Sequence, residues 1–428
     1  MPAFSHRVMT AGCRRGRHDD SGVVERSEMA ARQRGGACSG IRVIELGTMV
    51  TAPLAGQLLA DFGAEVIKIE PPQGEIMRGI PPVFEGRSAA FAQWNRNKKC
   101  VALDLKSPAG LAAARKLVDG ADALVTNFRP DVLEAFGFDY DAVAGRNPDI
   151  VYAALTGFGP DGPYAELASY DMVIQGLVGL MPNQGGDGPP QPIKSPVADK
   201  ISSYSAVMAM LAALLHRKAG GAGQKIEISM MDAYANFILP ELFYTRTFLD
   251  APPPVQWVKS IYNPFELSDG WVIGFVMTDR HFEGACDIFG LEAIRKDPRF
   301  ADPGARNVYQ PELMQEIAQA CRHMTVAAFV ELARANDLPF APVNDLDQFM
   351  GDPQAVHNQT FVEFDDPGRP ELGRLKLLNS FARMSGTPVD ARAFAPDVGA
   401  DNAEVLAAIG LTPAEIDAAT RGRAVAAE

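Results

Sequence analysis

The sequence has little cysteine. Its 428 residues include five, with no pair spaced as Cys-x-x-Cys, and these are Cys13, Cys38, Cys100, Cys286 and Cys321. An odd number at such spacings argues against a disulfide framework and against a thiolate zinc site. The six histidines show no ligand spacing either. We therefore predict a cytoplasmic protein, in a reducing environment, with no metal site.

Long apolar runs and excess positive charge are also missing. No apolar run reaches the ~20 residues of a membrane span. The formal net charge is −13, whereas nucleic-acid binding needs a wide basic surface. The composition, 47% hydrophobic and 22% charged, is that of a globular protein. We expect neither a membrane nor a nucleic-acid partner, although an acidic small molecule could still bind at a local basic patch.

Residues 1–39 lack hydrophobic periodicity and an apolar segment of the signal-peptide type. They are rich in Arg, Ser and Gly. This composition is typical of a disordered or non-native extension, so Met29 could be the true start. The acidic residues in the segment argue against a transit peptide.

From residue 41 onward, short apolar strands alternate with helices. Strands are expected at 41–46, 65–70, 101–105, 123–126, 150–155 and 225–229, and helices include 53–62 and 108–118. This alternation predicts an α/β fold in which a mostly parallel, Rossmann-like sheet is covered on both faces. Ligands of such folds bind at the carboxyl ends of the strands.

The first strand–helix turn lacks the dinucleotide fingerprint G-x-G-x-x-G. It reads Gly47-Thr-Met-Val-Thr-Ala-Pro-Leu-Ala-Gly56. A nicotinamide site is therefore unsupported. Glu70, at the end of the second strand, is interpreted as a surface acid rather than as a ribose ligand.

The pattern changes beyond about residue 235. A hairpin is expected to turn at Asp269-Gly270, followed by helices at 279–289, 310–323 and 325–336 with Thr325 as a cap. We predict four segments: the extension 1–39, a first part of the large domain at 40–234, a smaller α+β domain at 235–340, and a return to the large domain at 341–428. Short helices near Pro413 are expected to dock on the first domain.

The stretch around Asp199 is the most informative in the chain. A proline-rich approach at 188–196 ends at this carboxylate, and apolar residues then recur at helical spacing from Ile201 to Leu215. Asp199 is thus expected in the first turn of a helix, where unpaired N–H groups favour an ionised carboxylate. From these residues alone, Asp199 is either a helix cap or a catalytic group.

Other polar loops fall at predicted strand ends. The segment 95–99 carries three cations and is either a solvated loop or a phosphate contact. Asn127 and Arg129 follow a strand and could either form a turn or donate to a nucleotide. The glycines of 157–163 permit close backbone approach. Asp171, at a helix start, is interpreted as an early-turn acid rather than a catalyst.

Taken in order, these segments resemble the class III CoA-transferases, a family that includes formyl-CoA:oxalate and carnitine CoA-transferases and the α-methylacyl-CoA racemases. The resemblance covers the chain from Ile41 onward. It rests on these stretches: Ala52-Pro53, Asp61–Glu70, Asn95–Lys99, Asn127–Pro130, Gly157–Gly159, Gly162-Pro163, Tyr170-Asp171, the Asp199 stretch and Gly223–Ala233.

The resemblance implies a CoA-binding large domain built from both ends of the chain, an inserted small domain and an interlocked homodimer. Asp199 matches the nucleophilic aspartate, and CoA is a substrate rather than a tightly bound cofactor. The positions implied to contact CoA are Val50, Thr51, Lys98, Leu103, Lys106, Asn127, Phe128, Arg129, Ala168, Tyr170 and Asp171. Pro71 stands where several members carry Arg, so one cation near the CoA nucleotide is either absent or supplied by Arg78.

The chemistry of the residues agrees with acyl transfer. A carboxylate ionised at neutral pH can attack a thioester without a general base. The resulting aspartyl anhydride and aspartyl-CoA thioester keep the thioester energy, so CoA moves from an acyl-CoA donor to a free carboxylic acid. The alternative is a racemase that uses Asp199 as a base. Tyr170 disfavours it, because the related racemases have His there and Tyr is a poor base at neutral pH.

The sequence says less about the two carboxylic acids between which CoA moves, the donor acid and the acceptor acid. By family habit, a short dicarboxylate such as succinate is the expected donor acid. The glycine-rich loop of the oxalate enzyme is missing, which argues against oxalate as acceptor. Tyr262 and Asn263 are expected to shape the acyl pocket, and Phe265 or Trp257 either lines it or belongs to a core.

Overall fold

The computed structural model describes residues 35–250, 262–366 and 368–421. The chain divides into two compact units, one reaching Phe237 and resuming at Val362, the other running from Ile238 to Phe361. The limits expected at 235 and 340 for a small domain stay a prediction. Residues 1–34, with Met29, lie outside the described residues. Cys38 is buried and its N–H donates to Phe62 O, so ordered structure begins before residue 40, a correction to the expected extension.

A six-stranded sheet forms the centre of the first unit. Its strands are β1 Arg42–Leu46, β2 Glu65–Glu70, β5 Lys99–Ala102, β6 Ala123–Thr126, β7 Val151–Thr156 and β8 Gln224–Ser229. All neighbours pair in parallel, in the order β5-β2-β1-β6-β7-β8. Counted along the chain, this is the 3-2-1-4-5-6 order of dinucleotide-binding folds. The predicted parallel sheet is confirmed, although β5 begins earlier than the expected 101–105.

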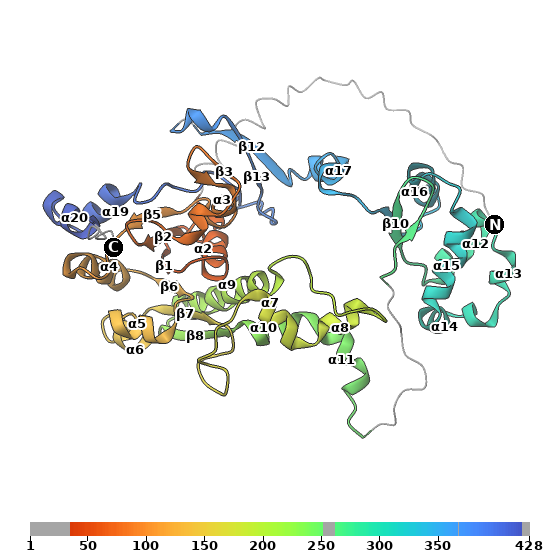
Figure 1. Ribbon diagram of the computed structural model, residues 1–428, viewed down its shortest axis with the longest axis horizontal. Coiled ribbons are helices and arrows are strands. Elements are labelled where there is room, and N and C mark those ends of the chain that lie inside the picture. Colours follow the sequence, from red (N-terminus) through yellow and green to blue (C-terminus); the bar gives the residue numbers. More distant parts are fainter. Residues whose placement is uncertain (1–34, 251–261, 367, 422–428) are drawn as a thin grey trace, which may run out of the picture. The chain divides into compact units, whose positions relative to one another are not determined.

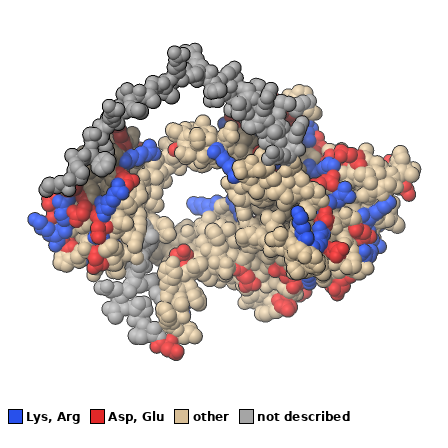
Figure 2. All heavy atoms as spheres, turned by 180° about the vertical axis from the view of Figure 1, so that it is seen from behind, with Lys and Arg blue, Asp and Glu red and all other residues tan. Residues whose placement is uncertain are grey.

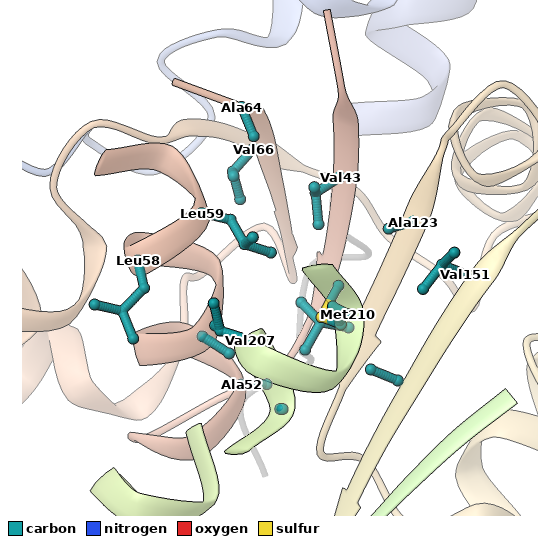
Figure 3. Packing of buried hydrophobic residues seen from close by; sticks show 14 of the residues in the cluster. Val43, Ala52, Leu58, Leu59, Ala64, Val66, Ala123, Val151, Val207 and Met210 are labelled. Carbon is teal, nitrogen blue, oxygen red and sulfur yellow. The ribbon is translucent and has the colours of Figure 1, made fainter. Parts of the chain in front are cut away.

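Two helices, α2 Thr51–Asp61 and α9 Val197–Lys218, cover one face of this sheet. Side chains alternate between the two faces along each strand, so Val43 joins this layer and Ile44 joins the opposite one. Figure 3 shows Met210 of α9 lying among Val43, Ala123 and Val151. This packing fixes the axis of α9, and with it the position of the first turn that carries Asp199.

The opposite face is covered by α4 Pro108–Asp119 together with the C-terminal helices α19 Asn402–Ala408 and α20 Pro413–Thr420 (Figure 1). Leu406 and Ala419 are buried here against Leu117 and Leu124. The expected docking of the tail on the first domain is confirmed, and the sheet is covered on both faces.

Among the described residues one helix, α9, is long and apolar enough by length and composition to cross a membrane. This helix differs from the expectation that no apolar run reaches the length of a membrane span. One side of α9 belongs to a core layer, with Ala206 and Met210 fully buried against the sheet, whereas Met208 and Leu215 are exposed. The helix ends before Gly220, whose φ of 95° is readily adopted by glycine.

The second unit has its own core. Strands β9 Phe265–Glu266, β10 Trp271–Gly274 and β11 Phe340–Pro342 form an antiparallel sheet, against which α12 Asp279–Phe289, α15 Gln310–Cys321 and α16 Val326–Ala335 pack. The predicted hairpin and the Thr325 cap are confirmed. Phe265 is a core residue rather than an exposed lining, since it contacts Phe329 and Phe340. Trp257 lies outside the described residues.

Shorter elements connect these layers. They are β3 Val83–Phe84, β4 Arg87–Ser88, α3 Ala89–Asn95, α5 Pro130–Phe136, α6 Tyr140–Ala144, α7 Asp171–Val178, α8 Leu180–Gly185, α10 Met230–Ile238, α11 Pro240–Phe243, α13 Glu292–Arg295, α14 Pro303–Val308, α17 Leu346–Met350, α18 Pro353–His357, β12 Phe361–Asp365 and β13 Arg374–Leu378. On the face drawn in Figure 2, basic and acidic side chains are interspersed among uncharged ones, and no continuous basic surface is seen.

Candidate active site

The loops predicted to bind a ligand gather at one edge of the sheet. Because all six strands are parallel, the segments that follow β1, β5, β6 and β7 leave from the same carboxyl edge. These segments carry the predicted contacts at 50–51, 103–106, 127–129 and 168–171. The strand order reverses direction between β1 and β6, which is where ligands bind in open α/β sheets.

Asn127 joins the two loops at this reversal point. Its Oδ1 accepts from Thr48 N–H at 3.0 Å, and its Nδ2 donates to Thr48 O and to Thr51 Oγ1, both at 2.8 Å. Both amide protons are therefore used inside the protein. Asn127 therefore ties the end of β6 to the β1–α2 loop, which agrees with the turn alternative, and a contact between Asn127 and CoA stays a prediction.

Asp199 lies in the first turn of α9, as predicted. The N-cap residue Pro196 provides no side-chain cap. The cap comes instead from Asp171, at the start of α7, whose Oδ2 accepts from Ala198 N–H at 2.7 Å and from Asp199 N–H at 3.2 Å. The terminal N–H groups of α9 thus stabilise Asp171, and the expectation that they stabilise the Asp199 carboxylate is wrong.

A buried glutamine fixes this arrangement. Gln175, 2% exposed, donates through Nε2 to Asp171 Oδ1 at 2.6 Å. The same side chain accepts from Ile193 N–H at 2.9 Å and also lies within hydrogen-bonding distance of the carbonyl oxygens of Ile193 and Ser195, at 3.2 and 3.1 Å. One side chain therefore holds both the capping carboxylate and the proline-rich approach to Asp199.

The electrostatics of Asp199 differ from the expectation of a fully ionised acid. Burial and the neighbouring Asp171 carboxylate raise the pKa of Asp199 to about 7. Both causes disfavour its charged form. At neutral pH the carboxyl group is present in both protonation states, and its ionised form is more basic than an ordinary aspartate.

The three cations of segment 95–99 are not a solvated patch. Arg96 pairs with Asp61 at 2.6 Å, Lys98 with Glu45 at 2.7 Å, and Lys99 with both Glu65 and Glu404. The Lys98 side chain has no exposed surface, so it does not face a ligand in this structure. Each of the three cations is paired with a carboxylate from a neighbouring element, whereas a contact of this segment with CoA phosphates stays a prediction.

Glu70 and Arg78 also form an internal pair. Glu70 is 3% exposed, and Arg78 Nε donates to its Oε2 at 2.9 Å. Arg78 further donates to Pro396 O at 3.0 Å and stacks over the Phe91 ring. The interpretation of Glu70 as a surface acid is therefore wrong. A contact between Arg78 and CoA stays a prediction, and the guanidinium would have to make it alongside these bonds.

The remaining predicted contacts divide into exposed and buried groups. The exposed residues are Lys106, Arg129, Ala168 and Tyr170. Arg129 lies 3.4 Å from Glu166, an exposed and therefore weak ion pair. Val50, Thr51 and Leu103 are buried, whereas Phe128 is intermediate. The exposed group supplies the polar and aromatic side chains that an incoming nucleotide could reach.

Sequence reasoning missed Tyr234 of α10. Its side chain is fully buried and its hydroxyl finds no hydrogen-bond partner within the described ranges. Burial and the Asp171 carboxylate raise the pKa of this phenol. Tyr234 thus belongs to the surroundings of the Asp171–Asp199 pair. An aromatic residue at a helical core position gives no signal of this in the sequence.

The fold and the site define a class of protein. A parallel sheet of this strand order, with a carboxylate of raised pKa near its carboxyl edge, is the framework of an α/β enzyme that acts on a small ligand bound at that edge. Among residues 35–250, 262–366 and 368–421, no group of His, Cys, Asp or Glu is arranged to hold a metal ion.

The chain belongs to the CoA-transferase family III, whose family model matches residues 38–402. It is 34% identical to the succinate–glutarate CoA-transferase of Agrobacterium fabrum, over 86% of this chain and 94% of that protein. It is 30% identical to the succinyl-CoA–D-citramalate CoA-transferase of Chloroflexus aurantiacus, over 87% and 94%. The crystal structure of a CAIB/BAIF family protein from Brucella suis matches it with a TM-score of 0.75 and 28% identity, covering 88% of this chain and all of that one.

Proposed function

We propose that this enzyme moves CoA from an acyl-CoA to a free carboxylic acid through covalent intermediates on Asp199. The observation that carries the proposal is the geometry of Asp199: a carboxylate in the first turn of α9, held through its own N–H and that of Ala198 by Asp171, at 3.2 and 2.7 Å. These bonds fix the backbone of the turn that carries Asp199, which limits the orientational freedom lost when the carboxylate meets the acyl group.

The reaction conserves the thioester energy in four exchanges. The Asp199 carboxylate attacks the thioester carbonyl, the C–S bond breaks, and CoA thiolate leaves an acyl-aspartyl anhydride. The thiolate attacks the Asp199 carbonyl carbon, which releases the first acid and forms an aspartyl-CoA thioester. The acceptor carboxylate displaces the thiolate to give a second anhydride. Thiolate attack on its acyl carbon then yields the new acyl-CoA and regenerates Asp199.

The raised pKa of Asp199 supports the nucleophilic role. Burial, the first cause, and Asp171 raise it to about 7. An ionised carboxylate in this setting is more basic than one in water, and basicity favours attack on a carbonyl. The same burial limits the access of water to an anhydride, which hydrolysis would otherwise destroy.

We assign CoA to the carboxyl edge of the sheet, with Lys106 and Arg129 as exposed cations for its phosphates and Tyr170 nearby. No tightly bound cofactor is required, because the chemistry uses only the carboxylate and the thioester. The inserted small domain, the homodimer and the cytoplasmic location belong to the same proposal. Relatives named for succinate and succinyl-CoA support a short dicarboxylic acid as one substrate.

A second candidate function is racemisation of a branched acyl-CoA with Asp199 as general base. One observation favours it, since a carboxyl group with a pKa of about 7 suits proton abstraction at neutral pH. Racemisation also needs a second base on the opposite face of the α-carbon, and the structure offers a poor candidate for it. Tyr170, 65% exposed, is the neighbouring candidate, and an ordinary tyrosine titrates near ~10.

Hydroxylamine trapping tests the proposal. Wild-type protein is mixed with succinyl-CoA or other acyl-CoAs and with hydroxylamine, which converts either aspartyl intermediate into a hydroxamate. Intact-protein and peptide mass spectrometry should place the hydroxamate on Asp199. The adduct should disappear in Asp199→Ala and persist in Asp187→Ala, which removes an exposed carboxylate just before the proline-rich approach. Deuterium entry at the α-carbon without any hydroxamate would replace transfer with racemisation.

A further inference from the structure

Four charged side chains are buried together beneath the β1–α2 loop. Glu45 comes from β1, Lys68 from β2, Glu75 from the segment after β2, and Lys98 from the residue before β5. None of these side chains is more than 1% exposed. Lys68 Nζ lies 2.9 Å from Glu45 Oε1 and 2.7 Å from Glu75 Oε1, and Lys98 Nζ lies 2.7 Å from Glu45 Oε2. We call these four residues the buried charge cluster.

The cluster bonds directly to the backbone of the loop and of the helix that follows it. Lys68 Nζ donates to Gly47 O at 2.8 Å, and Glu75 Oε2 accepts from Met49 N–H at 2.8 Å. Lys98 Nζ donates to Pro53 O at 2.7 Å. The bond to Gly47 holds the start of the turn, the bond to Met49 its middle, and the bond to Pro53 the beginning of the helix after it. This turn carries Val50 and Thr51 at the carboxyl edge of the sheet.

The loop connects onward to the nucleophile. Ser203, fully buried on α9, places its Oγ 2.8 Å from Thr51 O and 2.8 Å from Asp199 O. Thr51 is the first residue of α2, directly after the loop. The cluster therefore contacts the loop at Met49, the backbone continues from Met49 to Thr51, and Ser203 joins Thr51 to the first turn of α9.

We propose that the buried charge cluster is a positioning device for the transfer reaction: it holds the β1–α2 loop, and through Ser203 the Asp199 turn, in the reactive arrangement. This inference rests on the proposed function of Asp199. It also gives Lys98 a role different from the expected contact with CoA. None of the four residues touches the reacting atoms, so they act through the loop.

Two local features show why charged groups are needed at this place. Met49 has a φ of 64°, a left-handed conformation that non-glycine residues rarely adopt, so its N–H must be held by a strong acceptor. Gly56 leaves the space that Glu45 fills, because an added Cβ would lie 2.2 Å from Glu45 Oε2. Bonds to ionised groups are directional and stronger than neutral ones, whereas apolar packing would fill the space without fixing these backbone atoms.

The number of charges is balanced. Glu45 and Glu75 offset Lys68 and Lys98, so the cluster carries no net formal charge. Removal of one member leaves an unpaired buried charge, which destabilises a protein by much more than the intact pair stabilises it. Conservative and apolar changes at the same position, together with a control elsewhere, therefore separate positioning from a general loss of stability.

The experiment compares Glu75→Gln and Glu75→Leu with Asp61→Asn. Gln retains an acceptor for Met49 N–H, and Leu does not. Asp61→Asn weakens another buried ion pair of the same unit, with Arg96, at the opposite end of α2. Two quantities are measured: hydrogen exchange of peptides covering 47–56, and the rate of hydroxamate formation on Asp199 at saturating acyl-CoA, with thermal unfolding recorded for each variant.

We expect Glu75→Leu to accelerate exchange in the loop and to slow trapping by about 100-fold, the effect of a misplacement of ~1 Å. Glu75→Gln should lie between this variant and the wild type. Asp61→Asn should retain wild-type trapping and loop exchange even where its unfolding temperature falls. If Glu75→Leu does not fold, the Gln variant carries the comparison.

The outcomes distinguish the two claims. If the wild-type protein forms no hydroxamate, the proposed function of Asp199 is overturned. The hydrogen-exchange data then test only whether the cluster holds the β1–α2 loop. Loop exchange and trapping that change no more in the Glu75 variants than in Asp61→Asn would overturn the inference, because the cluster would then contribute only stability.

Discussion

Asp199 shares the start of α9 with a second carboxylate, and burial together with this neighbour raises its pKa to about 7. Asp171 accepts the two terminal N–H groups that could have stabilised Asp199, and its charge adds to the effect of burial. A helix terminus usually lowers the pKa of a nearby acid. Here the neighbouring acid occupies the donors, so the helix terminus does not offset burial and the Asp171 charge, which raise the pKa of Asp199.

The substitution Asp171→Asn separates the negative charge of Asp171 from its role as a helix cap. The amide oxygen can still accept from Ala198 and Asp199, but the negative charge is gone. We expect the pKa of Asp199 to fall from about 7, and the acid limb of the trapping rate to move to lower pH. The ionised form reacts, so the wild-type rate should decline as pH falls through about 7, and the variant should keep its rate to lower pH. The measurement is hydroxamate formation from pH 5 to 9.

The charge of Asp171 and its role as a helix cap should affect the pH dependence of the trapping rate in different ways. Asp171→Ala removes both the cap and the charge, and it should lower the rate at every pH. An acid limb that stays in place in Asp171→Asn would mean that burial alone sets the acidity of Asp199.

For a single residue, the sequence predicts the position within a helix or strand better than the side chains that contact it in the fold. The proline-rich approach and the helical spacing after Asp199 identified its position at a helix start. They could not identify Asp171 as the cap, because that contact joins residues 28 positions apart in the chain. The buried charges were missed for a related reason: Lys98 and Glu70 appear in a charged sequence context, and only the fold brings their partners to them.

At the scale of elements, α9 both carries Asp199, the proposed nucleophile, and packs against one face of the sheet. Met210 and Ala206 are fully buried against β1, β6 and β7. Hydrophobic periodicity predicted this helix and most of the strands, because apolar spacing reflects burial directly. Short elements such as β12 and β13, whose burial is partial, have no comparable pattern in the sequence.

Met210→Ala tests whether the packing of α9 is separable from its chemistry. The side chain is fully buried, and its removal should leave a cavity that costs about 2–5 kcal/mol of unfolding free energy. Met210 lies three helical turns beyond Asp199, so the trapping rate in the folded protein should stay within a few-fold of wild type. Denaturant unfolding at 25 °C, combined with trapping at the same temperature, measures both quantities.

Met208→Ala is the matched control, since this methionine of the same helix is 66% exposed and its truncation should change stability little. Equal losses in the two variants would show that the exposed face of α9 is also packed in solution, as the proposed homodimer would require.

At the scale of the whole chain, the C-terminal segment completes a sheet that begins near residue 42. Cys100 N–H donates to Asp401 Oδ2 at 2.7 Å, and Ala102 N–H donates to Asn402 Oδ1 at 2.8 Å. These bonds cover the outer edge of β5, the first strand in the sheet order. An uncovered edge strand is a site of aggregation. The tail therefore protects the sheet as well as packing on α4.

Removal of residues 400–428 should expose this edge together with the apolar surface that Leu406 and Ala419 cover. We expect the first unit to unfold at a lower temperature and to aggregate, while the second unit, which has a separate core, keeps its own transition. Removal of 422–428 alone leaves Asp401, Asn402, Leu406 and Ala419 in place and serves as the control. Calorimetry and size-exclusion chromatography of both truncations measure the effect. A long truncation that unfolds and elutes like the short one would show that the β5 edge is stable without Asp401 and Asn402, and that the return of the chain to the sheet contributes little to the first unit.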